Sequence, residues 1–130
     1  MTHRSFVFLL IFIGGGVGSM LRHAVNRISA LAFGMDFPYG TLFVNLVGSF
    51  VMGALAEWFA LRGSHSQSLR LFLTTGILGG FTTFSAFSLD AVLLWERDQL
   101  VTAAVYVGLS VLGAVLGVFF GLAILRSFLS

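Results

Sequence analysis

The sequence predicts an all-α membrane protein in which a single domain contains four transmembrane helices. Of the 130 residues, 58% are hydrophobic and only 9% are charged, and the mean hydropathy is +1.02. These values lie far outside the range of an ordinary soluble domain. The charged residues also divide the chain into four nearly uncharged runs, and a helix of about 20 residues crosses a bilayer core.

The four expected spans occupy almost the whole chain. We place them at about residues 5–30, 37–61, 69–95 and 99–126 of one domain covering residues 1–130. A cleaved signal peptide is not expected, because the first apolar run continues through "GGGVGSML" without a small-residue cleavage site. The chain has no cysteine, so disulfide bonds and thiolate metal sites are excluded.

Glycines at regular spacing predict close contacts between helices. The first span contains a GxxxG pair at Gly14 and Gly18, and in the fourth span Gly113, Gly117 and Gly121 repeat every four residues. Small residues at this spacing let the backbones of two membrane helices approach each other.

The third span is interrupted by "GGFTTFSAFS", residues 79–88. Each of the two adjacent glycines destabilises a helix by roughly 1 kcal/mol relative to alanine. The hydroxyl groups of Thr82, Thr83 and Ser85 can bind nearby backbone groups in place of the regular helix partners. Because the uncharged run has its midpoint at Gly80, we expect helix three to be broken near the bilayer midplane, with the glycines opening the backbone. Broken helices at this depth are a recurrent way to bind ions.

The few polar residues within the spans share helix faces. These faces carry Thr41, Asn45, Gly48 and Ser49 in the second span, and Thr102, Tyr106 and Ser110 in the fourth. Polar groups that face lipid are costly, so we expect both faces to meet a partner helix or a watery path. Their amide, phenol and hydroxyl groups donate hydrogen bonds, which suits a small anion, but they also accept, which leaves a cation or a neutral solute open.

The basic residues give no firm membrane orientation. All seven are arginines, and four fall on the side of the N-terminus while three fall on the other. The first group is Arg4, Arg62, Arg70 and Arg126, and the second is Arg22, Arg27 and Arg97. The positive-inside rule therefore allows insertion in both orientations, as in an antiparallel dual-topology homodimer, and it also allows one weakly biased topology.

Several functional classes are disfavoured by what the spans lack. Glu57 is the only acidic residue close to a span interior, whereas a proton-coupled exporter of cations needs a buried carboxylate. The sequence offers no nucleophile beside a base, no carboxylate pair and no cluster of metal ligands, so we do not expect an enzyme.

The chain resembles the Fluc or CrcB type of fluoride channel over all four spans. The matching segments are "GGGVGSMLRH", "YGTLFVNLVGSF", "TTGILGGFTTFSAFS" and the spacing from Tyr106 to Ser110, and the third of these is highly specific. The resemblance implies a fluoride-selective channel in the bacterial plasma (inner) membrane. It also implies an antiparallel homodimer with two pores, through which fluoride passively leaves the cytoplasm.

The resemblance implies roles along the fluoride pathway. Asn45 would donate a hydrogen bond to fluoride, and Phe84 and Phe87 would present their ring edges to it. Further hydroxyl groups along the path would be those of Thr41, Ser85, Tyr106 and Ser110.

The resemblance also implies a cation site and a vestibule. The backbone carbonyls of Gly79 and Thr82 would hold a structural sodium ion at the centre of the dimer, and Arg22 would lie near the vestibule. Two positions depart from the family pattern: Ala114 replaces an expected hydroxyl, and Asp90 stands where relatives often have glutamate. A small dual-topology multidrug exporter and a non-transporting membrane assembly subunit are the alternative functions.

Overall fold

The computed structural model describes residues 2–63 and 66–129, and the regular structure in these ranges is helical. The elements in chain order are α1 (His3–Phe33), α2 (Tyr39–Arg62), α3 (Gln67–Leu71), the π-helix η1 (Phe72–Leu78), α4 (Gly79–Phe81), α5 (Phe84–Glu96) and α6 (Leu100–Leu129). Four segments are long and apolar enough to cross a membrane: α1, α2, the stretch from α3 to α5, and α6. The prediction of an all-α protein with four such helices is confirmed.

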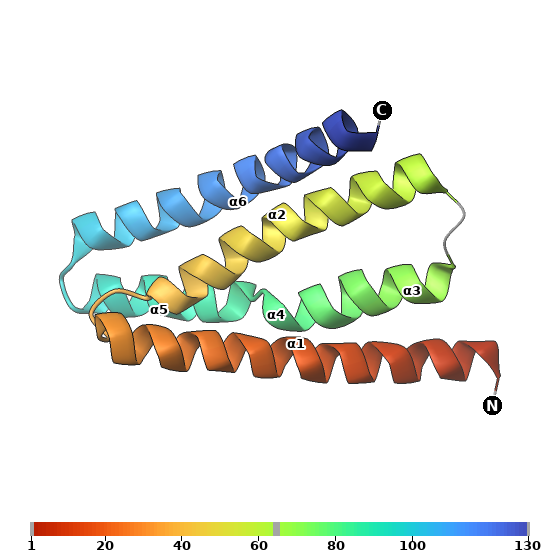
Figure 1. Cartoon of the computed structure of the whole chain (residues 1–130). Helices are drawn as coiled ribbons and strands as arrows, with labels where there is room; N and C mark the ends of the chain where they lie inside the picture. Colours follow the sequence, from red (N-terminus) through yellow and green to blue (C-terminus); the bar gives the residue numbers. More distant parts are fainter. Residues whose placement is uncertain (1, 64–65, 130) are drawn as a thin grey trace.

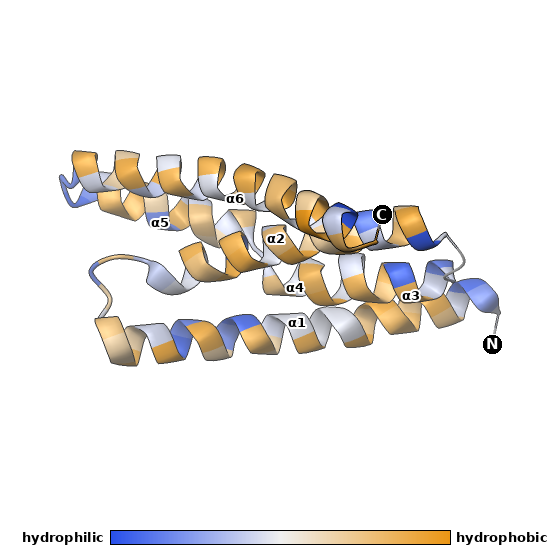
Figure 2. Cartoon of the chain, turned by 45° about the horizontal axis from the view of Figure 1, so that its top comes forward, coloured by the Kyte–Doolittle hydropathy of each residue, from blue (hydrophilic) through white to orange (hydrophobic). Residues whose placement is uncertain are grey.

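Consecutive segments run in opposite directions along an elongated bundle (Figure 1). Both described ends of the chain lie at the same end of the bundle, together with the C-terminal end of α2 and the N-terminal end of α3. α2 packs against α6, while α1 packs against η1 and α4. Hydrophobic residues recur along every long helix (Figure 2), and many of the large ones are exposed, as expected of a membrane-embedded protein.

Helix ends coincide with the signals that the sequence carries for them. The Thr2 hydroxyl accepts a hydrogen bond from the Ser5 N–H at 3.1 Å and caps α1. Gly34 ends α1 with a φ of 80°, and Gly63 ends α2 with a φ of 35°. Glycine adopts these left-handed backbone angles without the strain that a Cβ would cause.

α1 meets η1 and α4 along a closely packed line that we call the glycine seam, formed by Gly14, Gly18 and Gly80. A Cβ on Gly14 would lie 2.9 Å from the Phe72 carbonyl oxygen. A Cβ on Gly18 would collide with the Ile77 carbonyl oxygen, and one on Gly80 with a backbone oxygen of α1. The close contact predicted for the GxxxG pair is confirmed, because backbone packs directly against backbone here.

The glycines of α6 let that helix approach α2. A Cβ on Gly121 would collide with the Phe50 carbonyl oxygen, and one on Gly117 would lie 3.4 Å from the Leu46 carbonyl oxygen. A Cβ on Gly113 would collide with the end of the Leu46 side chain. The ridge of small residues in the fourth span therefore packs within the chain, on α2.

The irregular backbone of the third segment lies at two threonines. Thr82 (φ −89°, ψ 157°) and Thr83 (φ −154°, ψ 124°) are extended and separate α4 from α5. Gly79 and Gly80 are helical, so the expectation that these glycines open the backbone is wrong. The physical reason is that Gly80 lacks a side chain in order to let α1 approach, whereas the threonines find other partners for their backbone groups.

The π-helix η1 was not foreseen from the sequence. It covers seven residues directly before α4, and it includes Gly76, which packs against Gly14 of α1. π-helical turns are rare in proteins, and those that occur often lie at functional sites. The hydrophobic pattern does not distinguish them, because an apolar run looks the same in either kind of helix.

Candidate functional site

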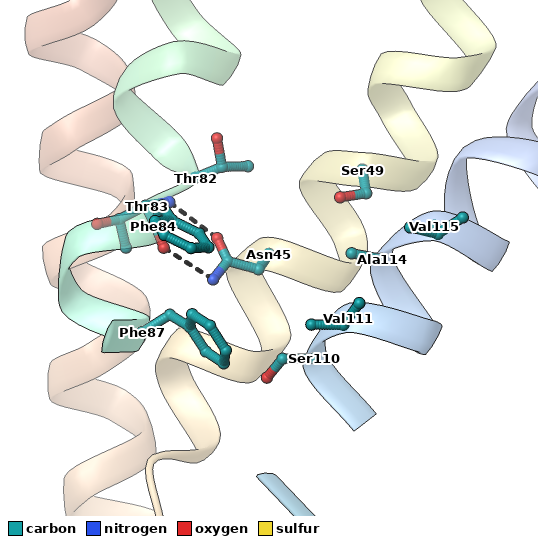
Figure 3. A pocket seen from close by; sticks show the side chains of 10 residues that line it. All are labelled: Asn45, Ser49, Thr82, Thr83, Phe84, Phe87, Ser110, Val111, Ala114 and Val115. Carbon is teal, nitrogen blue, oxygen red and sulfur yellow. Dashed lines mark hydrogen bonds between the residues drawn. The ribbon is translucent and has the colours of Figure 1, made fainter. Parts of the chain in front are cut away.

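A cavity of about 290 Å³ lies between α2, the junction of α4 and α5, and α6. We call it the polar groove. Figure 3 shows its ten lining side chains, which come from all three of these regions. They are Asn45, Ser49, Thr82, Thr83, Phe84, Phe87, Ser110, Val111, Ala114 and Val115.

The Asn45 side chain joins α2 to the extended backbone at Thr83. Its Nδ2 donates a hydrogen bond to the Thr83 carbonyl at 3.0 Å, and its Oδ1 accepts one from the Thr83 N–H at 2.8 Å (Figure 3). The Thr83 N–H needs an acceptor, which fixes the orientation of the amide. One of the two Nδ2 hydrogens is thus used within the chain, and the other can be donated to a solute.

The Thr83 side chain begins the next helix. Its hydroxyl oxygen accepts a hydrogen bond from the Ala86 N–H at 3.1 Å, which caps α5 at its N-terminus. A threonine in an extended conformation directly before a helix is a typical cap. Thr83 is therefore held through its backbone by Asn45 and holds α5 through its side chain.

Two serines bring hydroxyl groups to the groove from facing helices. The Ser110 residue is 6% exposed, and its hydroxyl oxygen is buried without a hydrogen-bond partner among the described residues. Ser49 lines the same groove from α2, one turn after Asn45. A buried hydroxyl without a partner is costly, so Ser110 marks a place where a polar solute or water would be stabilised.

Two phenylalanine rings form the apolar side of the groove. Phe84 and Phe87 both come from α5, and their ring centroids are 5.5 Å apart with an interplanar angle of 47°. Phe87 is buried, whereas Phe84 is 77% exposed in the single chain. The two rings that the sequence singles out are thus brought together beside Asn45 (Figure 3).

Thr41 and Tyr106 are buried and lie outside the lining of the groove. The Tyr106 ring packs against Phe87 at 5.4 Å between centroids, and its hydroxyl donates a hydrogen bond to Asp90 at 3.1 Å. Asp90, one of the two departures from the family pattern, therefore has a defined partner. Tyr106 lies on α6 between the groove and the end of the bundle where α5 and α6 are connected.

The remaining predicted residues lie around the junction of α4 and α5. Arg22 lies inside α1, and its Nε donates a hydrogen bond to the Gly80 carbonyl at 3.1 Å. Ser85 is exposed, and its hydroxyl is 3.3 Å from that of Thr83. Thr82 lines the polar groove, while Gly79 is exposed and lines a different cavity of about 590 Å³ beside η1.

Two polar residues of the groove, Thr83 and Ser49, were not among the predicted site residues. Thr83 had a signal in the sequence, because threonine is a typical residue directly before a helix. Ser49 also had one, since it lies four residues after Asn45 on the same face of α2. Ala114, the second departure from the family pattern, lines the groove without a polar atom.

Glu57 is engaged in an ion pair at the far end of α2. Arg126 donates from Nε to Oε1 at 3.2 Å and from Nη2 to Oε2 at 3.0 Å. The Glu57 side chain is 10% exposed and that of Arg126 is 62% exposed. No group of three or more His, Asp or Glu side chains that could hold a metal ion occurs in residues 2–63 and 66–129.

A bundle of four membrane-crossing helices with a groove in which neutral hydrogen-bond donors face apolar side chains has the features of a small channel or transporter. Residues 9–122 match the family model described as "CrcB-like protein, Camphor Resistance (CrcB)". The chain belongs to the CrcB family, and it is a multi-pass membrane protein.

Known relatives are similar to the chain over nearly their whole length. "Fluoride-specific ion channel FluC 2" of Nitrobacter hamburgensis is 56% identical over 119 residues, which cover 92% of this chain and 96% of the relative. "Fluoride-specific ion channel FluC" of Rhodopseudomonas palustris (strain BisB5) is 56% identical over 120 residues, which cover 92% and 97%. The protein of that name from Mesorhizobium japonicum is 48% identical over 122 residues. These are names of channels, so the expectation that the chain is not an enzyme is confirmed.

Proposed function

We propose that the protein is a fluoride-selective channel that lets fluoride leave the cytoplasm passively. The observation that carries this proposal is the polar groove, in which the buried Ser110 hydroxyl has no partner among the described residues and Asn45 keeps one amide hydrogen to donate. Relatives that share about half of its residues are named fluoride-specific channels. Fluoride is a small, strongly hydrated anion, so a path that replaces water must supply hydrogen-bond donors.

Selection follows from the chemistry of the lining. Asn45, Ser49 and Ser110 offer neutral donors, which can replace water around an anion without the strong attraction of a fixed positive charge. The edge of a phenyl ring is weakly positive, so Phe84 and Phe87 can face the anion without trapping it. Weak sites in sequence permit entry and rapid exit.

We further propose that two chains assemble as an antiparallel, dual-topology homodimer with two pores in the bacterial inner membrane. Phe84 is 77% exposed and lines a groove that is open in the single chain, so a second copy would close it. Arg22 lies beside the junction of α4 and α5, so the other arginines number four towards one bundle end and two towards the other, a small bias that still allows insertion in both orientations. A two-fold axis through the junction of α4 and α5 would place this interruption near the bilayer midplane.

A structural sodium ion at the centre of this dimer is also part of the proposal. Gly79 and Thr82 fit such an ion, because Gly79 is exposed and the extended Thr82 turns its carbonyl away from the helical direction. Hard cations are bound by oxygen atoms, and backbone carbonyls are among their common ligands. Two carbonyls from each chain would give four in a symmetric dimer.

Ion efflux from proteoliposomes tests the function directly. We expect fluoride to leave vesicles that contain the purified protein, while chloride and nitrate are retained. Comparable chloride flux, or no fluoride flux, would contradict the proposal. Export of a lipophilic cation that needs a proton gradient and is lost in Glu57→Gln would favour the exporter instead. The pairing of Glu57 with Arg126 and the family membership argue against that outcome.

The role of Asn45 is tested by Asn45→Asp. This substitution replaces the amide donor by an oxygen and places a negative charge in the groove, so we expect fluoride flux to fall by on the order of a hundredfold or more. Ser88→Ala is a matched control, because the Ser88 hydroxyl donates to the Phe84 carbonyl and does not line the groove. Full flux through a folded Asn45→Asp dimer would remove Asn45 from the pathway.

A further inference from the structure

We infer that Thr83 and Asn45 form a positioning pair that frees the carbonyls of Gly79 and Thr82 to bind a cation. The inference rests on the proposed sodium site and assigns its construction to two side chains. It also explains why the junction of α4 and α5 carries threonines where glycines alone would give a flexible break.

The first step concerns the Gly79 carbonyl. In an unbroken α-helix the carbonyl of residue i accepts a hydrogen bond from the N–H of residue i+4. The donor for Gly79 would be the Thr83 N–H, which instead donates to Asn45 Oδ1 at 2.8 Å. Asn45 therefore withdraws the helical donor of the Gly79 carbonyl.

The second step concerns the Thr82 carbonyl. Its donor in an unbroken helix would be the Ala86 N–H, which instead donates to the Thr83 hydroxyl oxygen at 3.1 Å. The extended backbone of Thr82 and Thr83 keeps this exchange in place. The Thr83 side chain thus withdraws the helical donor of the Thr82 carbonyl, just as Asn45 withdraws that of the Gly79 carbonyl.

The carbonyls of the residues before and after Gly79 do accept hydrogen bonds. That of Leu78 accepts hydrogen bonds from the Thr82 N–H at 3.0 Å and from the Thr82 hydroxyl at 2.8 Å. That of Gly80 accepts one from Arg22 Nε at 3.1 Å. Side chains therefore occupy the carbonyls on both sides of Gly79 and leave its own for another ligand.

The charges nearby indicate a monovalent cation. No carboxylate occurs between residues 67 and 89, so the ligands from this segment are neutral oxygens. The guanidinium of Arg22 binds the carbonyl next to Gly79, and no carboxylate of residues 67–89 offsets its repulsion of a cation, which is larger for a divalent ion. A hard monovalent ion such as sodium is the class that fits both facts.

Thermal unfolding of the detergent-solubilised dimer tests the inference without measuring transport. The melting temperature is followed as sodium replaces N-methylglucamine at constant ionic strength, because a ligand that binds only the folded state raises it. We expect sodium to stabilise the unsubstituted protein and Thr83→Ser, which keeps the hydroxyl group. Thr83→Val keeps the shape but removes the acceptor of the Ala86 N–H, which is then free to compete for the Thr82 carbonyl. In this variant we expect half-maximal stabilisation to need about tenfold more sodium.

The outcomes separate the inference from the proposed function. An equal sodium response in Thr83→Val and the unsubstituted protein would overturn the positioning role, and Thr83→Ala repeats the test should the valine variant not yield a folded dimer. An equal response to calcium would overturn the monovalent class. An unsubstituted protein that conducts fluoride but does not respond to sodium overturns the inference and leaves the channel standing. Absence of fluoride flux together with a sodium response overturns the proposed function alone.

Discussion

The glycine seam and the polar groove lie on either side of the same short helix, α4, and are built in opposite ways. In the seam, Gly18 of α1 brings its backbone so close to Ile77 and Phe81 that even a methyl group would collide. In the groove, Asn45 reaches the Thr83 backbone through a side chain and leaves a cavity of about 290 Å³. The seam fixes the position of α4. In the groove, the backbone that follows α4 makes polar contacts with the Asn45 side chain.

The difference teaches which substitutions affect folding and which affect transport. Backbone atoms cannot move aside for a new side chain, so a change in the seam is expected to alter stability. Most side chains of the groove border free space, so a change there can alter chemistry and leave the fold intact. Asn45 is the exception, because its side chain also holds the Thr83 backbone. The predictions below test this division, beginning with the largest expected effect on stability.

Gly18→Ala is expected to destabilise the protein most. The new Cβ would collide with the Ile77 carbonyl oxygen and lie 2.8 Å from the Phe81 nitrogen. Overpacking costs typically 1–3 kcal/mol, and with backbone on both sides we expect about 3 kcal/mol or more. The measurement is the melting temperature in detergent, together with the yield of folded protein.

Gly16→Ala is the matched control, because nothing lies within 4 Å of a Cβ at Gly16. Alanine favours a helix over glycine by about 1 kcal/mol, so this variant is expected to equal or exceed the unsubstituted protein in stability. If both variants lost the same stability, close contact would not explain the role of Gly18.

Asn45→Leu is expected to have the next largest effect. It removes both hydrogen bonds to Thr83 and leaves a partly buried N–H and carbonyl without partners, at a cost of about 2 kcal/mol. Ser110→Ala is the contrasting variant from the same groove. Its hydroxyl has no partner among the described residues, so the melting temperature should stay unchanged or rise while fluoride flux falls. A loss of stability in Ser110→Ala equal to that of Asn45→Leu would contradict this distinction.

The sequence predicts the seam better than the groove. The spacing of Gly14 and Gly18 is a local pattern with one structural meaning, and the structure bears it out. The convergence of Asn45, Phe84, Phe87 and Ser110 on one groove was expected from the resemblance. The place of the extended backbone was missed by three residues, since propensity favours the glycines.

The reason for that error is that partners outside the third segment decide where it leaves the helix. Asn45 is 38 positions away from Thr83, and its contact with the Thr83 backbone depends on how α2 packs. Gly80 takes its role from α1 in the same way. Local propensity reflects only the residues of the segment itself, so it cannot predict either contact, and tertiary contacts override it.

Ser49 offers the finest test of the division, because its substitution should alter transport and leave stability unchanged. Ser49 and Ala114 line the groove from the facing helices α2 and α6, so the hydroxyl missing at Ala114 can be supplied by Ser49. One neutral hydrogen bond contributes about 1 kcal/mol, so Ser49→Ala should lower fluoride flux about fivefold. Adding Ala114→Ser to it should restore much of the flux, because a donor returns to the same cavity from the other helix. Unchanged flux in Ser49→Ala would show that the anion passes the groove without contacting this side of α2. Lowered flux without recovery in the double variant would show that a hydroxyl at position 114 cannot take the place of Ser49.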